Sequence, residues 1–322
     1  MSNPKIKKIL AIQYSQTGQL AAVMDAFLAP LARANITVHR EILRHAPGHE
    51  YPYPWPLWTF MDTFPETVAG DPPPLAPLAI DPDGPDVQNI DLVIIGYPVW
   101  FLSPPPALTA FLRTPAARKL LRGRPVITVT ACRNMWLMAQ EKIKELLRDT
   151  GARHCDHIAL TDRGSALATF ITTPRWLLTG RKNAFCGLPP AGVPAQDIAA
   201  CSRFGRALLD TLSRDDATPP FLAGLRACAV DTRLIASERI GIRSFRVWAK
   251  ILRACGRPGA PLRRIILFIY TATLLAMIAT AVPLSMAIKT LLRPLLRARL
   301  ARLKHHYEQP SGSGSERLGQ FS

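Results

Sequence analysis

The chain has 322 residues, 48% of them hydrophobic, which is enough for one or two domains with a sizeable core. Its formal net charge of +17 is concentrated at one end, because residues 221–322 carry 17 Lys and Arg against 4 Asp and Glu, whereas residues 1–220 carry 23 against 19. The C-terminal part is expected to meet an anionic surface; nucleic acid is excluded as that surface because the sequence has no nucleic-acid motif and its charges are not interleaved with aromatic residues.

Strands and helices are expected to alternate along the first 161 residues. Short apolar runs predict strands at residues 8–14, 36–43, 91–97, 125–130 and 157–161. Apolar spacing of three and four residues predicts helices at 20–29, 107–112 and 137–148, and Pro30 is expected to end or kink the first of them. This alternation predicts an α/β fold built on a doubly wound parallel sheet.

A segment rich in proline and aromatic residues, about residues 45–89, interrupts the alternation after the second strand. Proline at this density is expected to prevent long regular structure. Because disordered linkers are poor in aromatic residues, we expect an ordered cover over the edge of the sheet or over the active site. We refer to residues 45–89 as the insert.

The first predicted strand leads directly into Ser15-Gln16-Thr17-Gly18-Gln19. At such a strand-loop-helix junction, the first helical turn offers backbone N–H groups and the positive end of the helix dipole to an anion. Ser15 and Thr17 add hydroxyl groups, and Gly18 lets the backbone come close. The loop therefore predicts a phosphate site; the alternative is an ordinary turn capped by Ser or Thr.

Two later loops follow predicted strands and belong to the same edge of the sheet, where doubly wound folds bind their ligands. One contains Tyr97, Pro98, Val99 and Trp100, and the other contains Cys132, Arg133 and Asn134. A flat isoalloxazine ring needs aromatic faces and polar groups at its edge, so Tyr97 and Trp100 are candidate stacking partners and Asn134 is a candidate edge contact. Together with the phosphate loop, these residues predict FMN as the cofactor. The alternative is that the aromatic side chains only pack under the insert.

Several segments resemble known families. Residues 14–19 and 96–100 resemble flavodoxins and flavodoxin-like quinone reductases. Longer stretches, Phe101–Pro104, Cys132–Glu141 and Ile171–Gly180, are similar to the DarA-type proteins of dialkylresorcinol biosynthesis, often labelled dialkylresorcinol condensing enzymes. The resemblance implies a flavodoxin-like fold and an oxidative aromatase that acts after a ketosynthase and converts a dialkyl-cyclohexanedione to a resorcinol.

Aromatising a cyclohexane-1,3-dione removes two hydrogens, one as a hydride to the flavin and one as a proton to a base. The sequence does not identify that base. His157 and Asp162 are weak candidates at the end of the last strand, where a lone His or Asp more often has a structural role. Arg175, Arg181 and Lys182 predict either contact with the substrate or an acidic acyl carrier, or a solvated basic face.

The uncharged run of residues 265–288 is long enough to cross a hydrocarbon core of roughly 30 Å, and basic residues flank it on both sides. Residues 288–303 have the pattern of a basic amphipathic helix in a membrane interface. We expect a flavodoxin-like domain at 1–220, a basic helical region with this membrane segment at 221–308, and a flexible tail at 309–322. A buried core helix of a soluble domain is the alternative for the apolar run.

The sequence leaves three functions open: a membrane-associated FMN-dependent oxidoreductase, an NAD(P)H:quinone or flavin reductase, and a non-catalytic membrane adaptor that kept the fold. The expected partners are a lipophilic cyclic dione or quinone, a lipid membrane, and a ketosynthase or acyl carrier protein. The six cysteines have no CxxC spacing, so no metal site is expected and reduced thiols are the simplest interpretation. No signal-peptide pattern is present, and the flavin domain is expected on the cytoplasmic face of the inner membrane.

Overall fold

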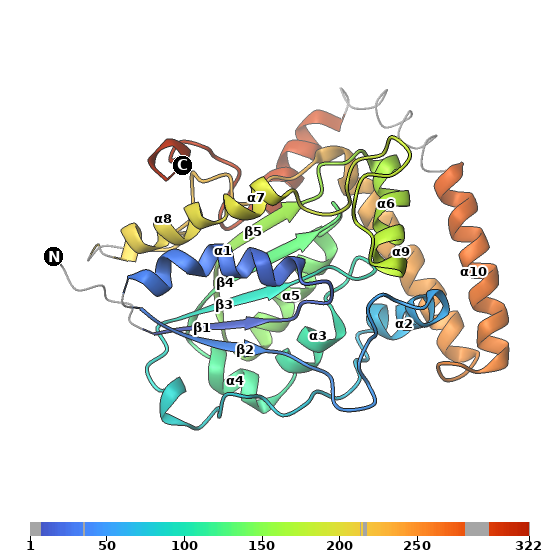
Figure 1. Ribbon diagram of the computed structural model, residues 1–322, viewed down its shortest axis with the longest axis horizontal. Helices are drawn as coiled ribbons and strands as arrows, with labels where there is room; N and C mark the ends of the chain where they lie inside the picture. Colours follow the sequence, from blue (N-terminus) through green and yellow to red (C-terminus); the bar gives the residue numbers. More distant parts are fainter. Residues whose placement is uncertain (1–7, 35, 213, 215–217, 281–295, 322) are drawn as a thin grey trace.

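The computed structural model describes residues 8–34, 36–212, 214, 218–280 and 296–321 (Figure 1). Five parallel strands form one sheet in the order β2-β1-β3-β4-β5. They are β1 (Lys8–Gln13), β2 (Thr37–Ile42), β3 (Leu92–Tyr97), β4 (Pro125–Cys132) and β5 (Arg153–Thr161). This strand order is that of the flavodoxin-like doubly wound fold, which confirms the predicted fold class.

Helices cover both faces of the sheet. On one face α1 (Gln19–Arg33) and α8 (Ser202–Leu212) pack together over one apolar cluster. On the other face α3 (Pro106–Leu112), α4 (Pro115–Leu121) and α5 (Leu137–Thr150) cover a second apolar cluster. All six residues of β3 are buried, as expected for a strand that is covered on both faces.

Pro30 does not end α1, which continues to Arg33. The helix tolerates this proline where α8 crosses it at Gly205. A Cβ atom at that position would lie 2.2 Å from the backbone oxygen of Phe27 and 3.1 Å from the ring of Pro30. The close crossing buries this part of α1, so packing outweighs the loss of one backbone hydrogen bond.

Four helices lie beyond the carboxyl ends of the strands (Figure 1): α2 (Leu57–Ala69), α6 (Ala166–Thr179), α9 (Thr232–Ala254) and α10 (Pro261–Ala279). α2, α9 and α10 share an apolar cluster in which Phe64 stacks on Tyr270 at a centroid distance of 4.7 Å. The remaining short elements are α7 (Ala195–Ala199) and the 3₁₀ turns Pro85–Val87 and Leu318–Gln320, while residues 296–308 are helical.

The insert contains a regular helix, α2, contrary to the expectation that its prolines prevent one. Pro56 immediately precedes the helix and Pro65 lies inside it, followed by an end at Gly70 in the left-handed conformation. The apolar side of α2 packs against α9 and α10, and this burial outweighs the cost of the internal proline.

Residues 309–321 pack against the sheet rather than forming the flexible tail that was expected. The backbone N–H of His157 donates to Ser311 Oγ at 2.7 Å, and Ser311 Oγ donates to Asp156 Oδ1 at 2.7 Å. Asp156 also accepts from the backbone N–H of Phe221 at 2.7 Å. The expected domain boundary at residue 220 therefore lies within a packed region, because residues on both sides of it belong to the core of the sheet.

Of the 24-residue apolar run, the structure describes the part within α10, and residues 281–295 lie outside the described residues. Within the described part of the chain, α10 is the one helix whose length and composition suit a membrane span, with a mean hydropathy of 1.8 over an 18-residue window of which 17% is buried. That exposure is contrary to the alternative of a buried core helix. The start of the predicted amphipathic helix at 288–303 also lies outside the described residues.

Candidate functional site

A cavity of about 140 Å³ lies at the carboxyl edge of the sheet, where β1, β3 and β4 end. The strand register pairs Gln13 with Gly96 and Gly96 with Val129, so the loops after these strands begin at the same level. The cavity is lined from the phosphate loop, from both later loops, from the insert and from α6. Ligands of doubly wound folds bind at this edge.

The loop from Ser15 to Gln19 forms the turn into α1. Gly18 is the residue before the helix and has a φ of 80°, the left-handed conformation that glycine adopts without strain. Ser15 Oγ accepts a hydrogen bond from the backbone N–H of Ala21 at 3.3 Å, so its hydroxyl caps the first turn. Thr17 lines the cavity beside the N-terminus of α1.

The two glutamines of the loop line the cavity and also bind protein groups. Gln16 Nε2 donates to the backbone oxygens of Tyr51 and Pro52 at 3.0 and 3.1 Å. Gln19 Oε1 accepts from the backbone N–H of Val193 at 2.7 Å. These hydrogen bonds fasten the insert and the segment after α6 to the loop, and Ser15, Thr17 and the backbone remain as groups that can donate to a phosphate.

The loop after β3 places three of its four predicted residues in the cavity, namely Pro98, Val99 and Trp100. The position of Tyr97 contradicts the prediction that its ring stacks on the flavin. It is fully buried on the α5 face of the sheet, and its hydroxyl donates to Gln140 Oε1. Side chains of a strand alternate between the two faces, and Tyr97 still belongs to β3, so it cannot turn into the cavity.

Trp100 lies in a group of aromatic rings that joins the loop to the insert. Its ring contacts those of Tyr14, Tyr51 and Trp55 at centroid distances of 5.8, 5.3 and 5.2 Å. The backbone of the next two residues, Phe101 and Leu102, has positive φ angles of 50° and 60°, which is uncommon outside glycine and concentrates at functional sites.

The loop after β4 contributes Cys132 and Arg133 to the same cavity. Burial lowers the pKa of Arg133 to about 10, and its guanidinium lies 3.9 Å from the centre of the Phe170 ring. Among the described residues, no carboxylate lies within ion-pair distance of Arg133. Burial also raises the pKa of the Cys132 thiol, which therefore stays protonated at neutral pH. Asn134 lies in a neighbouring cavity instead.

The two candidate bases occupy different places. His157 is fully buried in a network under the sheet, where its Nδ1 is 2.8 Å from Thr128 Oγ1, and burial lowers its pKa well below the usual range. His157 does not line the cavity, which contradicts a role as base. Asp162 does line it, and its two carboxylate oxygens accept from the N–H groups of Gly164 and Gly192, both at 2.7 Å.

The sequence did not single out several residues that close the cavity. Trp55 and Phe60 reach it from the insert, which confirms that the insert covers this edge of the sheet. Helix α6 and the segment after it add Thr173, Trp176, Leu177 and Gly192. Aromatic density in the insert was the available signal, but no local pattern tells which of its rings turn inward.

Of the basic residues of the α6 region, Arg175 has local partners, whereas Arg181 and Lys182 are exposed. Arg175 Nη1 donates to the backbone oxygen of Asn183 at 2.9 Å, and its guanidinium lies 4.7 Å from the centre of the Phe185 ring. Residues 171–179 belong to α6, and Pro174 lies inside the helix. Arg175 thus stabilises the turn after α6.

A second cavity of about 400 Å³ lies between the strand-end loops and the helices α9 and α10. It shares the lining residues Val99, Phe101, Cys132 and Arg133 with the first cavity. The two cavities are therefore neighbours, separated by these four residues.

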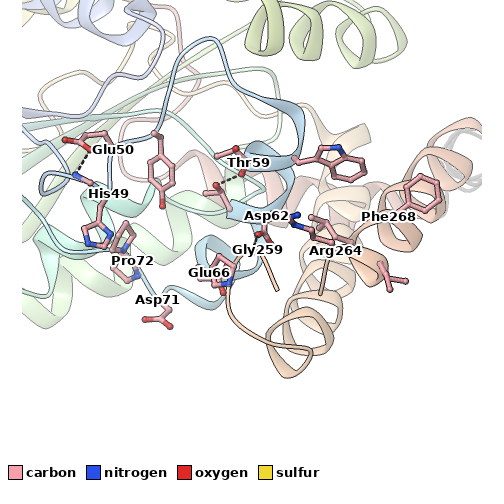
Figure 2. Close-up of a pocket in the computed structure, with 18 of the residues that line it drawn as sticks. His49, Glu50, Thr59, Asp62, Glu66, Asp71, Pro72, Gly259, Arg264 and Phe268 are labelled. Carbon is pink, nitrogen blue, oxygen red and sulfur yellow. Dashed lines mark hydrogen bonds between the residues drawn. The ribbon is translucent and has the colours of Figure 1, made fainter. Parts of the chain in front are cut away.

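A third cavity, of about 1100 Å³, lies between the insert and α10 (Figure 2). Two of its acidic residues, Asp62 and Glu66, already bind Arg263. None of its lining residues belongs to the phosphate loop or to the loops after β3 and β4. We therefore place the candidate site at the first two cavities.

No protein-family model matches the chain, and no curated protein does. Among solved structures, a flavoprotein in complex with FMN from Lactobacillus acidophilus is 17% identical, with 48% of this chain and 93% of that chain covered and a TM-score of 0.38. A flavodoxin from the domain Archaea is 10% identical, with 64% and 99% covered and a TM-score of 0.37. A WrbA-like flavodoxin from Agrobacterium tumefaciens is 9% identical, with 62% and 94% covered and a TM-score of 0.35. The strand order itself, rather than these distant likenesses, defines the fold.

Proposed function

We propose that the chain is an FMN-dependent oxidoreductase that acts on a lipophilic ring compound at a membrane surface. The observation that carries the proposal is the cavity at the switch point of the sheet, with the phosphate loop at one end and aromatic rings around the rest. The N-terminus of α1 provides anion-binding N–H groups at the place where the fold binds phosphates.

The residues present fit FMN in chemistry. Thr17, Gly18 and the first turn of α1 would hold the phosphate, and Val99, Trp100 and Trp55 would contact the isoalloxazine ring. The first cavity alone, at about 140 Å³, is smaller than the ~300–1,000 Å³ of common ligand pockets, so binding of the ring requires a movement of the insert.

FMN, when bound, accepts the two electrons that oxidation of the substrate releases. The protein's part is binding, orientation and exclusion of water. Arg133 would supply a positive charge where the two cavities meet, and its burial would strengthen the effect of that charge. Trp55, Phe60 and Trp176 close the cavity to water, and the Asp162 carboxylate is the group that can accept the proton from the substrate.

The specific reaction that we propose is the aromatisation of a dialkyl-cyclohexanedione to a resorcinol. It is supported by the sequence similarity at Cys132–Glu141 and Ile171–Gly180, and both segments line or border the two cavities. A ketosynthase or acyl carrier protein would supply the substrate. The exposed apolar helix α10 favours a place at a membrane, which we propose is the cytoplasmic face of the inner membrane.

The second candidate is a membrane-associated NAD(P)H:quinone reductase, which the same apolar cavity would suit. Incubation with a 2,5-dialkylcyclohexane-1,3-dione separates the two, since only the aromatase forms a resorcinol. Rapid NADPH-quinone turnover without resorcinol formation would favour the reductase. If the purified protein were colourless and did not bind added FMN, the result would instead favour a non-catalytic adaptor on this fold.

Thr17→Asp tests the phosphate site directly. The new carboxylate would repel the phosphate and remove a hydroxyl donor, so the Kd for FMN, measured by quenching of flavin fluorescence, should rise about 100-fold or more. Thr17→Ser is the matched control, because it keeps the hydroxyl group and should bind FMN within about threefold of the native protein. Equal affinities for the native protein and Thr17→Asp would contradict FMN binding at this loop.

A further inference from the structure

We infer that the second cavity holds the alkyl chain of a lipid-soluble substrate, which enters from the bilayer between α9 and α10 while its polar ring lies at Arg133. The inference rests on the proposed function for the identity of the reacting ring. The second cavity would then be a separate site for the alkyl chain, and the substrate would have a route of entry from the bilayer. A flavin site alone requires neither.

The lining of the cavity points to an amphiphile. Arg133 is the one charged side chain among the residues that line it. The rest of the wall is mainly apolar, and α9 and α10 contribute most of it: Leu234, Ile240, Gly241, Phe245, Trp248, Tyr270, Leu274, Met277 and Ile278. A ligand with a polar head and an apolar chain matches one charged group at one end of an otherwise apolar wall.

The head of that ligand would lie beside the flavin. Arg133, Cys132, Val99 and Phe101 line both cavities, so a ring held at Arg133 is next to the phosphate-loop cavity. A guanidinium donates hydrogen bonds to carbonyl or enolate oxygens, and Arg133 has no carboxylate partner among the residues that the structure describes. The junction therefore suits the oxygen substituents of a dione or quinone ring.

The other end of the cavity lies against the apolar helix. α10 turns Tyr270, Leu274 and Met277 toward the cavity. Its other apolar side chains are 47–62% exposed, namely Leu262, Ile265, Phe268, Ile269 and Leu275, of which Ile265, Phe268 and Ile269 also border the open third cavity. Apolar side chains at this exposure along one helix suit contact with lipid, so α10 separates the bilayer from the cavity.

Gly241 of α9 lines the cavity beside the loop after β3. A Cβ atom at Gly241 would lie 3.1 Å from Leu102 Cδ1, so a larger side chain at this position would narrow the cavity. At about 400 Å³ the cavity lies within the ~300–1,000 Å³ of common ligand pockets, and its mainly apolar wall suits an apolar molecule.

The test compares 2-decyl-1,4-benzoquinone with 2-methyl-1,4-benzoquinone as probes of the flavin-free full chain in phosphatidylcholine nanodiscs. Binding in the cavity is measured by quenching of the fluorescence of Trp248, which lines it. The Trp248 signal is the fluorescence of the native protein minus that of Trp248→Phe. We expect the native protein to bind the decyl compound at least tenfold more tightly. Leu274→Trp, which fills the cavity, should remove most of that preference.

Leu275→Trp is the matched control, because the neighbouring side chain is 62% exposed and points away from the cavity. It should keep the native preference. Leu274→Ala adds no bulk and should weaken decylquinone binding about threefold, so the inference stays testable if Leu274→Trp does not fold. Equal affinities for the two quinones, or equal losses in the 274 and 275 variants, would overturn it.

The readout needs no flavin, so the two proposals can fail separately. Selective decylquinone binding by a chain that does not bind FMN would remove the proposed function and keep the chain site. FMN binding without any preference for the longer quinone would keep the proposed function and remove the chain site.

Discussion

Glu238 is a buried acid that joins α9 to the start of α5. Its Oε1 accepts a hydrogen bond from the backbone N–H of Met138 at 2.7 Å, at the N-terminal end of that helix. Desolvation raises the pKa of Glu238 from 4.5 to about 8. The folded state therefore favours the protonated acid, and the stability that this gives is complete below about pH 4.5 and is lost as the pH rises through 8.

Replacing Glu238 by glutamine should remove that loss, because the amide keeps a hydrogen-bond acceptor and cannot ionise. At pH 9 we expect Glu238→Gln to be more stable than the native protein by at least ~1.4 kcal/mol, the equivalent of one pKa unit. The two proteins should differ little at pH 5. Urea unfolding at both pH values measures this, and Glu145→Gln, at an exposed ion pair with Lys142, should show no such dependence. A native protein that is equally stable at pH 5 and 9 would contradict the prediction.

The residues of the site differ in how far the sequence could place them. The strand-loop-helix junction at residues 13–19 follows from a strand, a glycine and a helix in immediate succession, so local physics is enough to predict its shape. Tyr97 was misplaced because the sequence does not distinguish the last residue of a buried strand from the first residue of the loop. As the last residue of β3, Tyr97 points into the core beside the sheet and not into the cavity. Trp55 and Trp176 could not be assigned because their contacts with the site depend on packing between distant segments.

At the scale of elements, α2 and α10 are joined by the buried guanidinium of Arg263. Its Nε donates to Asp62 Oδ1 at 2.6 Å, and Nη2 donates to Glu66 Oε2 at 2.6 Å. Arg263→Leu would leave both carboxylates without this partner. We expect the free energy of unfolding to fall by about 2 kcal/mol. This is less than the ~3–5 kcal/mol lost when a fully buried ion pair is broken, because Arg253 still lies 3.8 Å from Glu66.

The neighbouring Arg264 provides the control, since it is exposed and the described residues give it no ion pair. Arg264→Leu should change the free energy of unfolding by less than about 0.5 kcal/mol. Because α2 belongs to the cover of the cavity, Arg263→Leu should also expose Trp55, which quenching by acrylamide would detect. Equal unfolding free energies for the two variants would show that the ion pair does not hold the insert in place.

Helix α2 in the insert was not predicted because its stability comes from packing and not from its local sequence. Pro65 lowers the local helix propensity of α2, and the helix forms because its apolar side packs against α9 and α10, almost 200 residues later in the chain. The same holds for residues 309–321, whose Gly and Ser content suggests flexibility. Their order comes from Asp156 and the backbone of β5, which only the folded sheet provides.

For the whole molecule, the basic C-terminal part and the apolar outer side of α10 predict binding to anionic lipid. α9 adds Arg239, Arg243, Arg246 and Lys250 to this part. Ile265→Glu combined with Leu275→Glu places two charges on the outer side of α10, where the native side chains are 59% and 62% exposed. Burying one such apolar side chain contributes roughly 1.5–3 kcal/mol. The fraction that floats with vesicles of phosphatidylglycerol and phosphatidylcholine should therefore fall at least tenfold.

Ile42→Glu on the edge strand β2 should leave flotation unchanged, although Ile42 is 47% exposed as well. Salt divides the interaction into its parts, because 1 M NaCl reduces the Debye length to about 3 Å and screens the arginines while it leaves apolar burial intact. Native protein should thus stay partly bound in high salt, whereas the double variant should be released. If instead the native protein were released completely by salt, electrostatic attraction alone would account for binding, and the apolar side of α10 would face another protein surface rather than lipid.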